Sequence, residues 1–456
     1  MIEDVFDGMD VILAATLGCG IAQTAAKVQR LARAPRGAPG PPRGLARARP
    51  LRQRLAPATS GRGDAGMVDV LIAGGAVMGA SVAFWLKRLD PSLDIEVVEP
   101  DPTYATSSTA LAASGIRMQF SDPVNVQISR FGVDFIRDFA RHTGPAGEVP
   151  DLGFRENGYL FLARTDTGAA TLESLAEMQR GLGAGTRVLD PTELAAKFPW
   201  MGFDDIAAGS WGSRDEGFFD NMGLLGGLRN AARAAGVRFV RDRVVALERD
   251  GDRIAAAVLE RGGPRTAQAY VNCIGPRAAM LMRTAGLDLP VEPRKRTVFV
   301  VDAPEARHPD APLVIDPSGI WFRPEHGQWL AATVPATDGP CDETDFEPEH
   351  ALFEDEVWPA LYNRAEGFGA AKVVRLWAGH YAFNTLDQNA ILGRNPQVPN
   401  LYHANGFSGH GLQQAPAVGR GIAEQIVHGD WVTLDLSPLS LQRVLDGRPM
   451  TEAAVV

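Results

Sequence analysis

Apolar runs and glycine-rich turns alternate along the chain from Met67 onward. Val68 to Ile72 is a continuous β-branched and aliphatic run, which is typical of a parallel strand buried on both faces. Residues 80–89 keep aliphatic side chains on one side and predict a helix. Ile95 to Val98 predicts a second buried strand that ends at Glu99. The predicted order is therefore strand, glycine turn, helix, strand and acid.

This order is typical of a dinucleotide-binding βαβ unit. The glycines Gly74, Gly75 and Gly79 would let the backbone approach a pyrophosphate at a helix N-terminus. Glu99 follows Gly79 by 20 residues, the spacing expected of an acid that binds the ribose hydroxyls. Ala76 replaces the second glycine of the GxGxxG pattern. The motif alone is therefore also compatible with a glycine turn that binds no nucleotide.

A second glycine-rich turn lies near the C-terminus. Leu401 to Ala404 predicts a short strand, residues 405–411 a glycine-rich loop, and Gln414 to His428 a helix with Pro416 near its first turn. A reduced flavin carries negative charge near N1 and O2, which a helix dipole stabilises. This helix N-terminus is therefore an element of the kind that a bound flavin needs.

The middle of the chain predicts two kinds of sheet. Antiparallel strands that cross over, as in flavoproteins, are expected at 236–240, 244–247 and 254–259. A buried strand ending in glycine is expected at 270–275, and strands of a further domain at 158–163, 297–301 and 320–323.

The predicted fold is a two-domain α+β or α/β flavoprotein. A Rossmann-type FAD-binding domain is expected from residues 67–150, 211–290 and 376–456. Residues 151–210 and 291–375 are expected to form an interleaved substrate domain on a mixed or antiparallel sheet.

Charge and cysteine content exclude several function classes. The chain of 456 residues has a net charge of −10, and residues after 66 carry −15, so we expect no nucleic-acid partner. The three cysteines lie far apart, which predicts neither a metal site nor a disulfide framework and favours a reducing, cytoplasmic compartment.

Residues 1–66 differ in composition from the rest of the chain. They contain ten Lys and Arg residues and a stretch rich in Arg, Ala, Pro and Gly, which predicts an extension outside the fold, with Met67 as the natural start. The alternative is an Arg-rich targeting peptide, although acidic residues stand at its front. The apolar stretch 11–26 is too short and interrupted to span a membrane.

Several motifs together resemble one known superfamily. The motifs are GGxxxG, the Ser107–Thr109 loop, CIG at 273–275, WAG at 377–379, NTLDQN at 384–389 and GFSGHGLQQAP at 406–416. Their order resembles the D-amino-acid oxidase superfamily of FAD-dependent oxidoreductases, which includes glycine oxidase, monomeric sarcosine oxidase and dimethylglycine dehydrogenase. Within it, EPRKR at 292–296 and DEGFFD at 215–220 are similar to mitochondrial FAD-dependent oxidoreductase-domain proteins linked to respiratory complex I assembly, and to their bacterial relatives.

The resemblance implies a set of FAD-binding residues. These are Gly74, Gly75 and Gly79 for the pyrophosphate, Glu99 for the ribose, Ser107, Ser108 and Thr109 for the phosphate and flavin edge, Val244 for adenine, Gly275 for the ADP half, and Gly409, His410, Gly411, Leu412 and Gln413 for the pyrimidine side of the flavin. The alternative for the serines is a solvated loop.

The chain departs from the superfamily where relatives attach flavin covalently or bind the substrate carboxylate. The attachment positions hold His380 and Leu111, so we expect tight but noncovalent FAD. The carboxylate-binding Arg of glycine oxidase is replaced by Tyr381, and the corresponding Lys of sarcosine oxidase by Gln413.

Other residues could take over these roles. Arg117 and Arg323 are candidates for a substrate carboxylate, because a guanidinium fork matches it well. Each could equally form a structural ion pair. His410 could hydrogen-bond the flavin or the substrate, and the run 294–296 is expected to be a solvated turn entering a strand.

The predicted activity is FAD-dependent oxidation of a C–N bond in a small amine or amino acid of the glycine, sarcosine, N-methyl or D-amino-acid type. Arg117, Tyr381 and His410 are the candidate catalytic residues, and no metal is expected. Oxygen, a quinone or an electron-transfer protein would reoxidise the flavin. The alternatives are a flavoprotein that assists respiratory-complex assembly and an NAD(P)H-dependent flavoenzyme.

Overall fold

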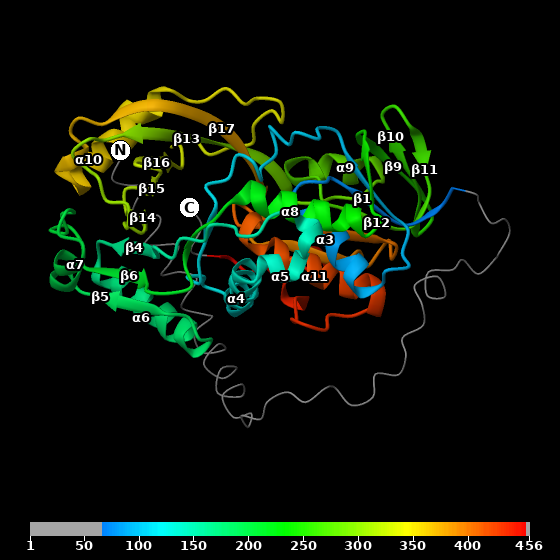
Figure 1. Cartoon of the computed structure of the whole chain (residues 1–456), viewed down its shortest axis with the longest axis horizontal. Helices are drawn as coiled ribbons and strands as arrows, with labels where there is room; N and C mark the ends of the chain where they lie inside the picture. The colour runs from blue at the N-terminus through cyan, green and yellow to red at the C-terminus, as the bar shows by residue number, and fades with distance from the viewer. Residues whose placement is uncertain (1–65, 453–456) are drawn as a thin grey trace.

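A six-stranded sheet forms one half of the computed structural model, in which residues 66–452 are described (Figure 1). Its strands are β1 (Val68–Ala73), β2 (Ile95–Glu99), β8 (Arg238–Arg241), β12 (Ala267–Asn272), β18 (Ile391–Arg394) and β19 (Leu401–Asn405). They follow the order β18-β19-β12-β1-β2-β8, and all neighbours are parallel except β18 and β19. All six residues of β1 are buried, because both faces of the sheet are covered.

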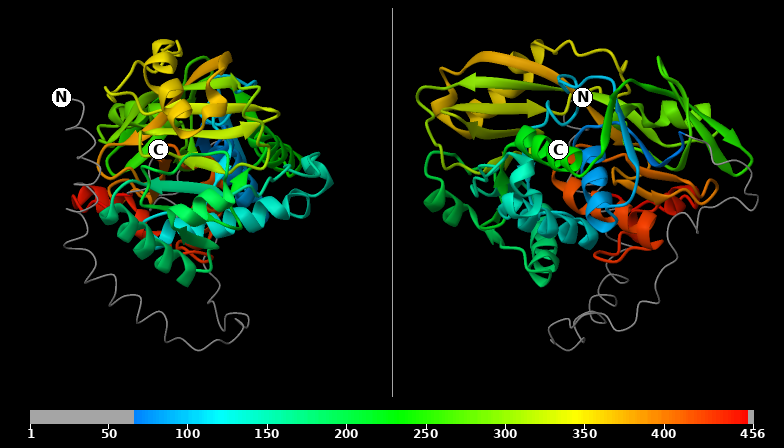
Figure 2. Two further views of the ribbon diagram at one scale, coloured as in Figure 1. Left: turned by 90° about the vertical axis from the view of Figure 1, so that its left-hand side faces the viewer. Right: turned by 45° about the vertical axis from the view of Figure 1, so that its right-hand side comes forward.

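Helices cover one face of this sheet and a small sheet covers the other (Figure 2). The helices are α3 (Val77–Leu89), α4 (Pro123–Arg137), α8 (Asn221–Ala234) and α11 (Gly411–His428). On the other face lie α9 (Ala278–Thr284) and the antiparallel strands β9 (Val244–Asp250), β10 (Arg253–Leu259) and β11 (Gly263–Arg265). The hydrophobic core of this half of the molecule is therefore split into two layers by the sheet.

An eight-stranded sheet forms the second half, on the left in Figure 1. Its strands are β4 (Tyr159–Ala163), β5 (Thr186–Leu189), β6 (Ala208–Gly212), β13 (Val291–Asp302), β14 (Leu313–Ile315), β15 (Ile320–Glu325), β16 (Gln328–Thr333) and β17 (Lys372–Asn384). They follow the order β17-β13-β16-β15-β14-β4-β6-β5, with one parallel pair, β14 and β4. The sheet is therefore mixed, as expected.

The remaining strands and α-helices are short or lie outside the two large sheets. They are β3 (Gly115–Ile116), β7 (Gly217–Phe218), α5 (Phe139–Thr143), α6 (Asp166–Gly181), α7 (Pro191–Lys197), α10 (Trp358–Arg364) and α12 (Leu441–Leu445). No helix within residues 66–452 is both long and apolar enough to cross a lipid bilayer.

The two sheets confirm the predicted fold class, and three local predictions are corrected. β8 pairs in parallel with β2, so 236–240 is not an antiparallel crossing strand. The run 294–296 lies inside β13 and pairs with β17, so it is not a solvated turn. The last helix begins at Gly411, which places Pro416 beyond its first turn.

The structure bears on two parts of the expected domain division. Residues 376–384 are expected in a FAD-binding segment, but as part of β17 they pair with β13 of the eight-stranded sheet. The proposed extension 1–66 lies outside the described residues except for Gly66.

Candidate functional site

A cavity of about 750 Å³ is bounded by residues of both large sheets. Part of its wall follows the carboxyl ends of parallel strands: Gly74 after β1, Glu99 at the end of β2, Cys273 after β12 and Phe407 after β19. Another part comes from the eight-stranded sheet, including Trp321 of β15. Open α/β sheets bind ligands at the carboxyl ends of their strands, so this cavity is the candidate functional site.

The cavity brings together most of the residues that the sequence singled out. Those in its wall are Gly74, Glu99, Ser107, Ser108, Thr109, Arg117, Val244, Gly275, Tyr381, Gly409, His410, Gly411, Leu412 and Gln413. Gly75 and Gly79 are not part of the wall. The N–H of Gly75 donates to Glu99 Oε2 at 2.8 Å, and a Cβ on Gly79 would overlap the carbonyl oxygen of Gly74. Both residues therefore stabilise the shape of the turn without contacting the cavity.

The turn between β1 and α3 ends at a helix N-terminus that borders the cavity. Gly74 has φ +90°, a conformation that favours glycine. Ala76 precedes the first helical residue and supplies no side-chain cap, while Thr109 Oγ1 accepts from the N–H of Val77 at 3.3 Å. A helix N-terminus of this kind favours an anion in the cavity.

Glu99 stands where β2 ends. Its carboxylate accepts hydrogen bonds from the backbone N–H groups of Gly75 and Asp101, at 2.8 and 3.0 Å. Burial raises the pKa of Glu99, and these two backbone hydrogen bonds oppose the shift. The carboxylate is thus held in place at the cavity wall.

Gly275 lies in the same cavity wall as Glu99, at a point where the backbone faces open space. It has φ +61°, and a Cβ built there would meet no atom within 4 Å. Val244, Arg243 and Arg277 line the wall with it. The two arginines, which the sequence analysis did not single out, add positive charge that suits a diphosphate.

The N-terminus of α11 borders another part of the cavity. His410 precedes this helix and makes no side-chain cap to it. Gly409 has φ +94°, and its Cα packs so close to the Tyr381 ring that a Cβ would lie 2.7 Å from that ring. The Gln413 side chain accepts from the backbone N–H of Arg117 at 2.8 Å. Gln413 therefore ties α11 to the Arg117 segment.

Arg117 is a buried cation in the cavity wall. Its guanidinium lies 4.5 Å from the Phe120 ring centre and 5.4 Å from that of Phe161. Its Nη2 lies 3.1 Å from Nε2 of His410, and its Nε donates to the Gln119 carbonyl at 3.2 Å. Burial lowers the pKa of His410 well below its usual range, and the charge of Arg117 lowers it further. His410 is therefore a neutral imidazole beside a guanidinium.

Tyr381 lies near Arg117 and keeps its proton at neutral pH. Burial raises the pKa of Tyr381 above its usual value, although the charges of Arg296 and Arg117 oppose the shift. Its hydroxyl can therefore donate a hydrogen bond to an anion in the cavity.

Glu216 is a titratable group behind Arg117 that the sequence analysis missed. Its carboxyl is completely buried and accepts from the Met118 N–H at 3.0 Å and the Gln119 amide at 2.9 Å. Burial raises the pKa of Glu216 to about 7, against the opposing effects of these donors and of Arg117. Its place in a short DEGFFD turn gave no sign of this burial.

His380 lies in the wall near the Ser107–Thr109 loop. Its ring stacks on Phe346 at 4.3 Å, and its Nε2 lies 2.6 Å from the carbonyl oxygen of Asp345. The backbone carbonyl of His380 accepts from Ser108 Oγ at 2.7 Å. Ser108 therefore ties the loop to β17.

Arg323 is a structural residue and does not line the cavity. Its guanidinium forms an ion pair with Glu325, donates to the Ala113 carbonyl at 2.9 Å, and lies over the Phe218 ring. The structure therefore favours the second alternative for Arg323, a structural ion pair, because Glu325 compensates its charge outside the cavity.

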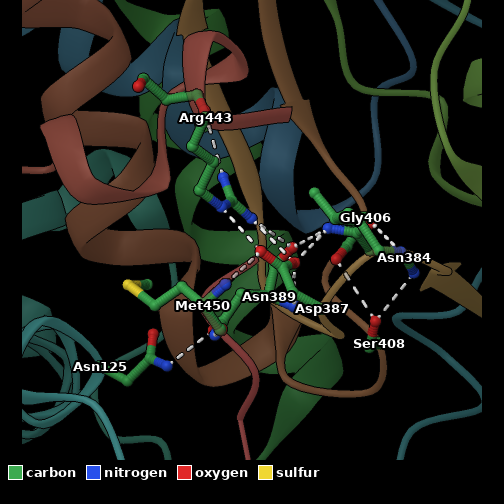
Figure 3. Close-up of polar contacts among 10 residues, drawn as sticks. Asn125, Asn384, Asp387, Asn389, Gly406, Ser408, Arg443 and Met450 are labelled. Carbon is green, nitrogen blue, oxygen red and sulfur yellow. Dashed lines mark hydrogen bonds and ion pairs between the residues drawn. The ribbon is translucent and has the colours of Figure 1, made fainter. Parts of the chain in front are cut away.

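A buried polar network supports the loop before α11 (Figure 3). Asp387 accepts from Arg443 Nε at 2.8 Å, from Asn384 Nδ2 at 2.7 Å and from the Met450 N–H at 3.0 Å. The backbone N–H of Asn384 in turn donates to Ser408 Oγ at 3.0 Å. The NTLDQN motif thus joins the C-terminal segment to the Gly406–Ser408 turn.

Comparison with known proteins places the chain in a family. The family model described as FAD dependent oxidoreductase, named DAO, matches residues 69–425. The chain belongs to the DAO family of FAD-dependent oxidoreductases. Over 423 residues it is 39% identical to FAD-dependent oxidoreductase domain-containing protein 1 of Xenopus laevis, covering 85% of each chain. This confirms the resemblance found in the sequence.

Solved structures of the DAO type share the fold. L-proline dehydrogenase from P. horikoshii superposes with a TM-score of 0.74 at 24% identity, over 84% of this chain and 99% of that one. Glycine oxidase from Geobacillus kaustophilus gives a TM-score of 0.70 at 24% identity, over 83% and 99%. At this identity the likeness establishes the architecture alone.

The cavity of this DAO family member fits the cofactor of its family. The open space at Gly275 leaves room for a group that a side chain would otherwise fill. Two helix N-termini without side-chain caps from their N-cap residues border the cavity, and both favour negative charge. The acceptor Glu99 and the cations Arg243 and Arg277 suit the hydroxyl and phosphate groups of a dinucleotide.

Proposed function

We propose that this DAO family protein oxidises the C–N bond of a small amine that carries a carboxylate. The observation that carries the proposal is the buried Arg117 guanidinium in the wall of the cavity, beside neutral His410 and protonated Tyr381. Guanidinium groups bind carboxylates by paired, charge-assisted hydrogen bonds. Solved structures with the same fold include a glycine oxidase and an L-proline dehydrogenase, whose names specify amino-acid substrates.

FAD would occupy the same cavity. The turn formed by Gly74, Gly75 and Gly79 would hold the pyrophosphate, Glu99 the ribose, Ser107, Ser108 and Thr109 the phosphate and flavin edge, Val244 and Gly275 the adenosine half, and Gly409, His410, Gly411, Leu412 and Gln413 the flavin. When bound, FAD supplies the acceptor for the hydride that leaves the substrate carbon.

The protein residues would orient the substrate and control its charge. Arg117 would bind the carboxylate and Tyr381 would donate a second hydrogen bond to it. Loss of the hydride from carbon and of the amine proton gives an imine, which water hydrolyses to a carbonyl compound and an amine. An amine that binds neutral needs no separate base, so the main task of the site is positioning.

We expect FAD to be bound without a covalent link. Leu111 has no nucleophilic atom, and the His380 ring is engaged by Phe346 and the Asp345 carbonyl. After acid precipitation the yellow colour should stay in the supernatant. A coloured pellet that becomes colourless in His380→Ala would show a covalent link instead.

Anaerobic flavin bleaching tests the activity. The holoenzyme is titrated with glycine, sarcosine, D-alanine and L-proline, and with the amide of each as a matched control. We expect at least one amino acid to bleach the flavin and its amide to act far less efficiently. Bleaching by NADH or NADPH alone would support a nicotinamide-dependent flavoenzyme, and bleaching by none would favour the assembly role. Mixing the reduced protein with oxygen, a quinone or an electron-transfer flavoprotein then identifies the acceptor.

A further inference from the structure

One face of the eight-stranded sheet presents a row of apolar side chains to the cavity. Val298 of β13 pairs with Ala332 of β16. Ala332 pairs in turn with Trp321 of β15, and Trp321 pairs with Ile315 of β14. Residues that stand directly opposite each other on antiparallel strands lie on the same face of a sheet. These four residues, the apolar row, therefore share one face, and all four line the cavity.

The opposite face of the same strands is packed into a hydrophobic core. Side chains alternate between the two faces along a strand, so a residue next to a member of the apolar row belongs to the other face. These neighbours are at most 1% exposed, and they are Phe299, Ala331, Phe322 and Val314. By contrast, Trp321 is 8% exposed and Ile315 is only half-buried. The apolar row therefore keeps accessible surface where it borders the cavity.

Tyr159 lies between the apolar row and Arg117. It pairs with Leu313 of β14, which stands two residues before Ile315 on the same face of the sheet. Tyr159 and Leu313 both line the cavity. The guanidinium of Arg117 lies 6.0 Å from the ring centre of Tyr159. A ligand whose carboxylate binds Arg117 would therefore have the apolar row close to its other end.

The cation next to the apolar row is already compensated. Arg296 precedes Val298 by two residues on β13 and belongs to the same face. Arg296 forms an ion pair with Asp338 at 2.7 Å, and Asp338 also pairs with Arg294. Arg296 therefore gives a second anionic group on the ligand little attraction.

The chemistry of the apolar row favours an apolar group on the ligand. Val298, Ala332 and Ile315 have no side-chain donor or acceptor, and Trp321 has a single indole N–H. A polar group against the aliphatic side chains would lose its hydrogen bonds to water, whereas an apolar group gains free energy by leaving water. Neighbouring strands lie about 4.8 Å apart, so the four strands of the row span roughly 14 Å. This width accommodates a branched alkyl group or an aromatic ring.

We propose that the apolar row selects substrates with an apolar side chain or an apolar N-substituent. This assignment rests on the proposed function, in which Arg117 binds the carboxylate of the substrate. The substrate class is thus an amino acid that carries an alkyl or aryl group, rather than glycine or an amino acid with a charged side chain. The apolar group would lie against the row while the carboxylate is held at Arg117.

Binding of carboxylates that lack an amine tests this assignment without turnover. The probes are acetate, propanoate, butanoate and pentanoate, and 4-hydroxybutanoate as an analogue of pentanoate with a hydroxyl in place of the last methyl group. Their dissociation constants are measured from the change in flavin absorbance of the oxidised holoenzyme. We expect each added methylene to tighten binding about threefold, and 4-hydroxybutanoate to bind about tenfold more weakly than pentanoate.

Two variants of the apolar row test whether it causes this preference. Val298→Thr keeps the shape of the side chain but adds a hydroxyl, and Ala332→Ser does the same at a smaller residue. Each should reduce the preference for pentanoate over acetate by about threefold or more and leave acetate binding nearly unchanged. Val300→Thr is the matched control, because Val300 lies two residues further along β13 on the same face but does not line the cavity. It should keep the full preference.

The outcomes separate this assignment from the proposed function. Equal binding of all chain lengths, or of pentanoate and 4-hydroxybutanoate, would overturn the role of the apolar row alone, even if no variant folds. A preference that survives both row variants would do the same. Loss of FAD from the row variants with an unchanged preference would show that the row contacts the cofactor instead. Failure of all five carboxylates to bind would contradict the carboxylate site at Arg117, and the role of the row with it.

Discussion

At the scale of single residues, the environment of Arg117 determines what the cavity can bind. Aromatic rings surround its guanidinium, and the neighbouring imidazole of His410 is neutral. Water can do little to screen a charge in such surroundings, so its interaction with an anion is strong. Arg323 is as deeply buried, but Glu325 compensates its charge in an ion pair.

Replacing Arg117 should separate acids from amides. Arg117→Met keeps much of the side-chain volume but removes the charge, so KM for an amino-acid substrate should rise on the order of 10²-fold. KM for the corresponding amide should change little. Arg323→Met is the control and should lower the melting temperature without changing the ratio of the two KM values. Equal losses for acid and amide in Arg117→Met would make Arg117 a structural residue.

A methyl group at Gly275 should interfere with the cofactor. Gly275→Ala places its Cβ in open space beside the cavity at φ +61°, so FAD should be lost while the fold persists. Gly447→Ala is a matched control, because it has φ +60° and equally open surroundings away from the cavity. FAD content per chain is measured by absorbance. The role of Gly275 would be disproved by equal FAD content in the two variants.

At the scale of elements, the residue that directly precedes α4, Asp122, is a titratable group. Burial raises the pKa of Asp122 to about 7, and the charges of Glu452 and Asp387 add to the shift. The unfolded chain releases this proton near pH 4. The native state therefore binds the proton more tightly, and the stabilisation present below about pH 4 is lost as pH rises through 7.

Asp122→Asn should flatten this pH dependence. Asn is also a good N-cap residue and cannot ionise. The variant should gain more in melting temperature at pH 8 than at pH 5, relative to the original protein. Thermal unfolding at both values measures this difference, and an equal shift at both would show that another group titrates.

The predictability of each element followed from how clearly its sequence showed which face is buried. β1 and α3 are predictable because a continuous apolar run indicates a buried strand and the glycine turn after it marks the start of a helix. β8 was misplaced, since a short strand with exposed charged ends resembles a strand of either sheet.

The candidate site was predictable where a motif fixes a turn, and less so where strands meet. The glycines and Glu99 follow strands in sequence, so their positions could be inferred from spacing. Arg296 belongs to a charged run, which favours a solvated turn, but it lies inside β13 and lines the cavity. Its position depends on the pairing of β13 with β17, which the local sequence does not encode.

At the scale of the whole molecule, the Asp387 network locks the C-terminal segment onto the fold. Asp387 and Arg443 are almost completely buried as an ion pair. Arg443→Met would leave a buried carboxylate uncompensated and should reduce the free energy of unfolding by about 3–5 kcal/mol. Arg448→Ala removes an exposed ion pair with Asp446, which solvent screens, and should cost far less stability.

Denaturant unfolding of both variants checks this difference. The double variant Asp387→Asn with Arg443→Met should recover part of the lost stability, because the uncompensated charge is then gone. A loss in Arg443→Met no larger than in Arg448→Ala would mean that the network of Figure 3 contributes little to stability.

The close packing of α3 against α11 has a consequence for biosynthesis. Ser81 Oγ of α3 donates a hydrogen bond to the carbonyl of Ala415 in α11. The two residues are 334 positions apart in the chain. At about 5–20 residues per second, a ribosome needs roughly 17–67 seconds to make the intervening chain. During that time the first βαβ unit exists without the helix that completes its surroundings. A nascent chain should therefore acquire its cofactor only after translation of α11, and until then its exposed apolar surface would be a substrate for chaperones.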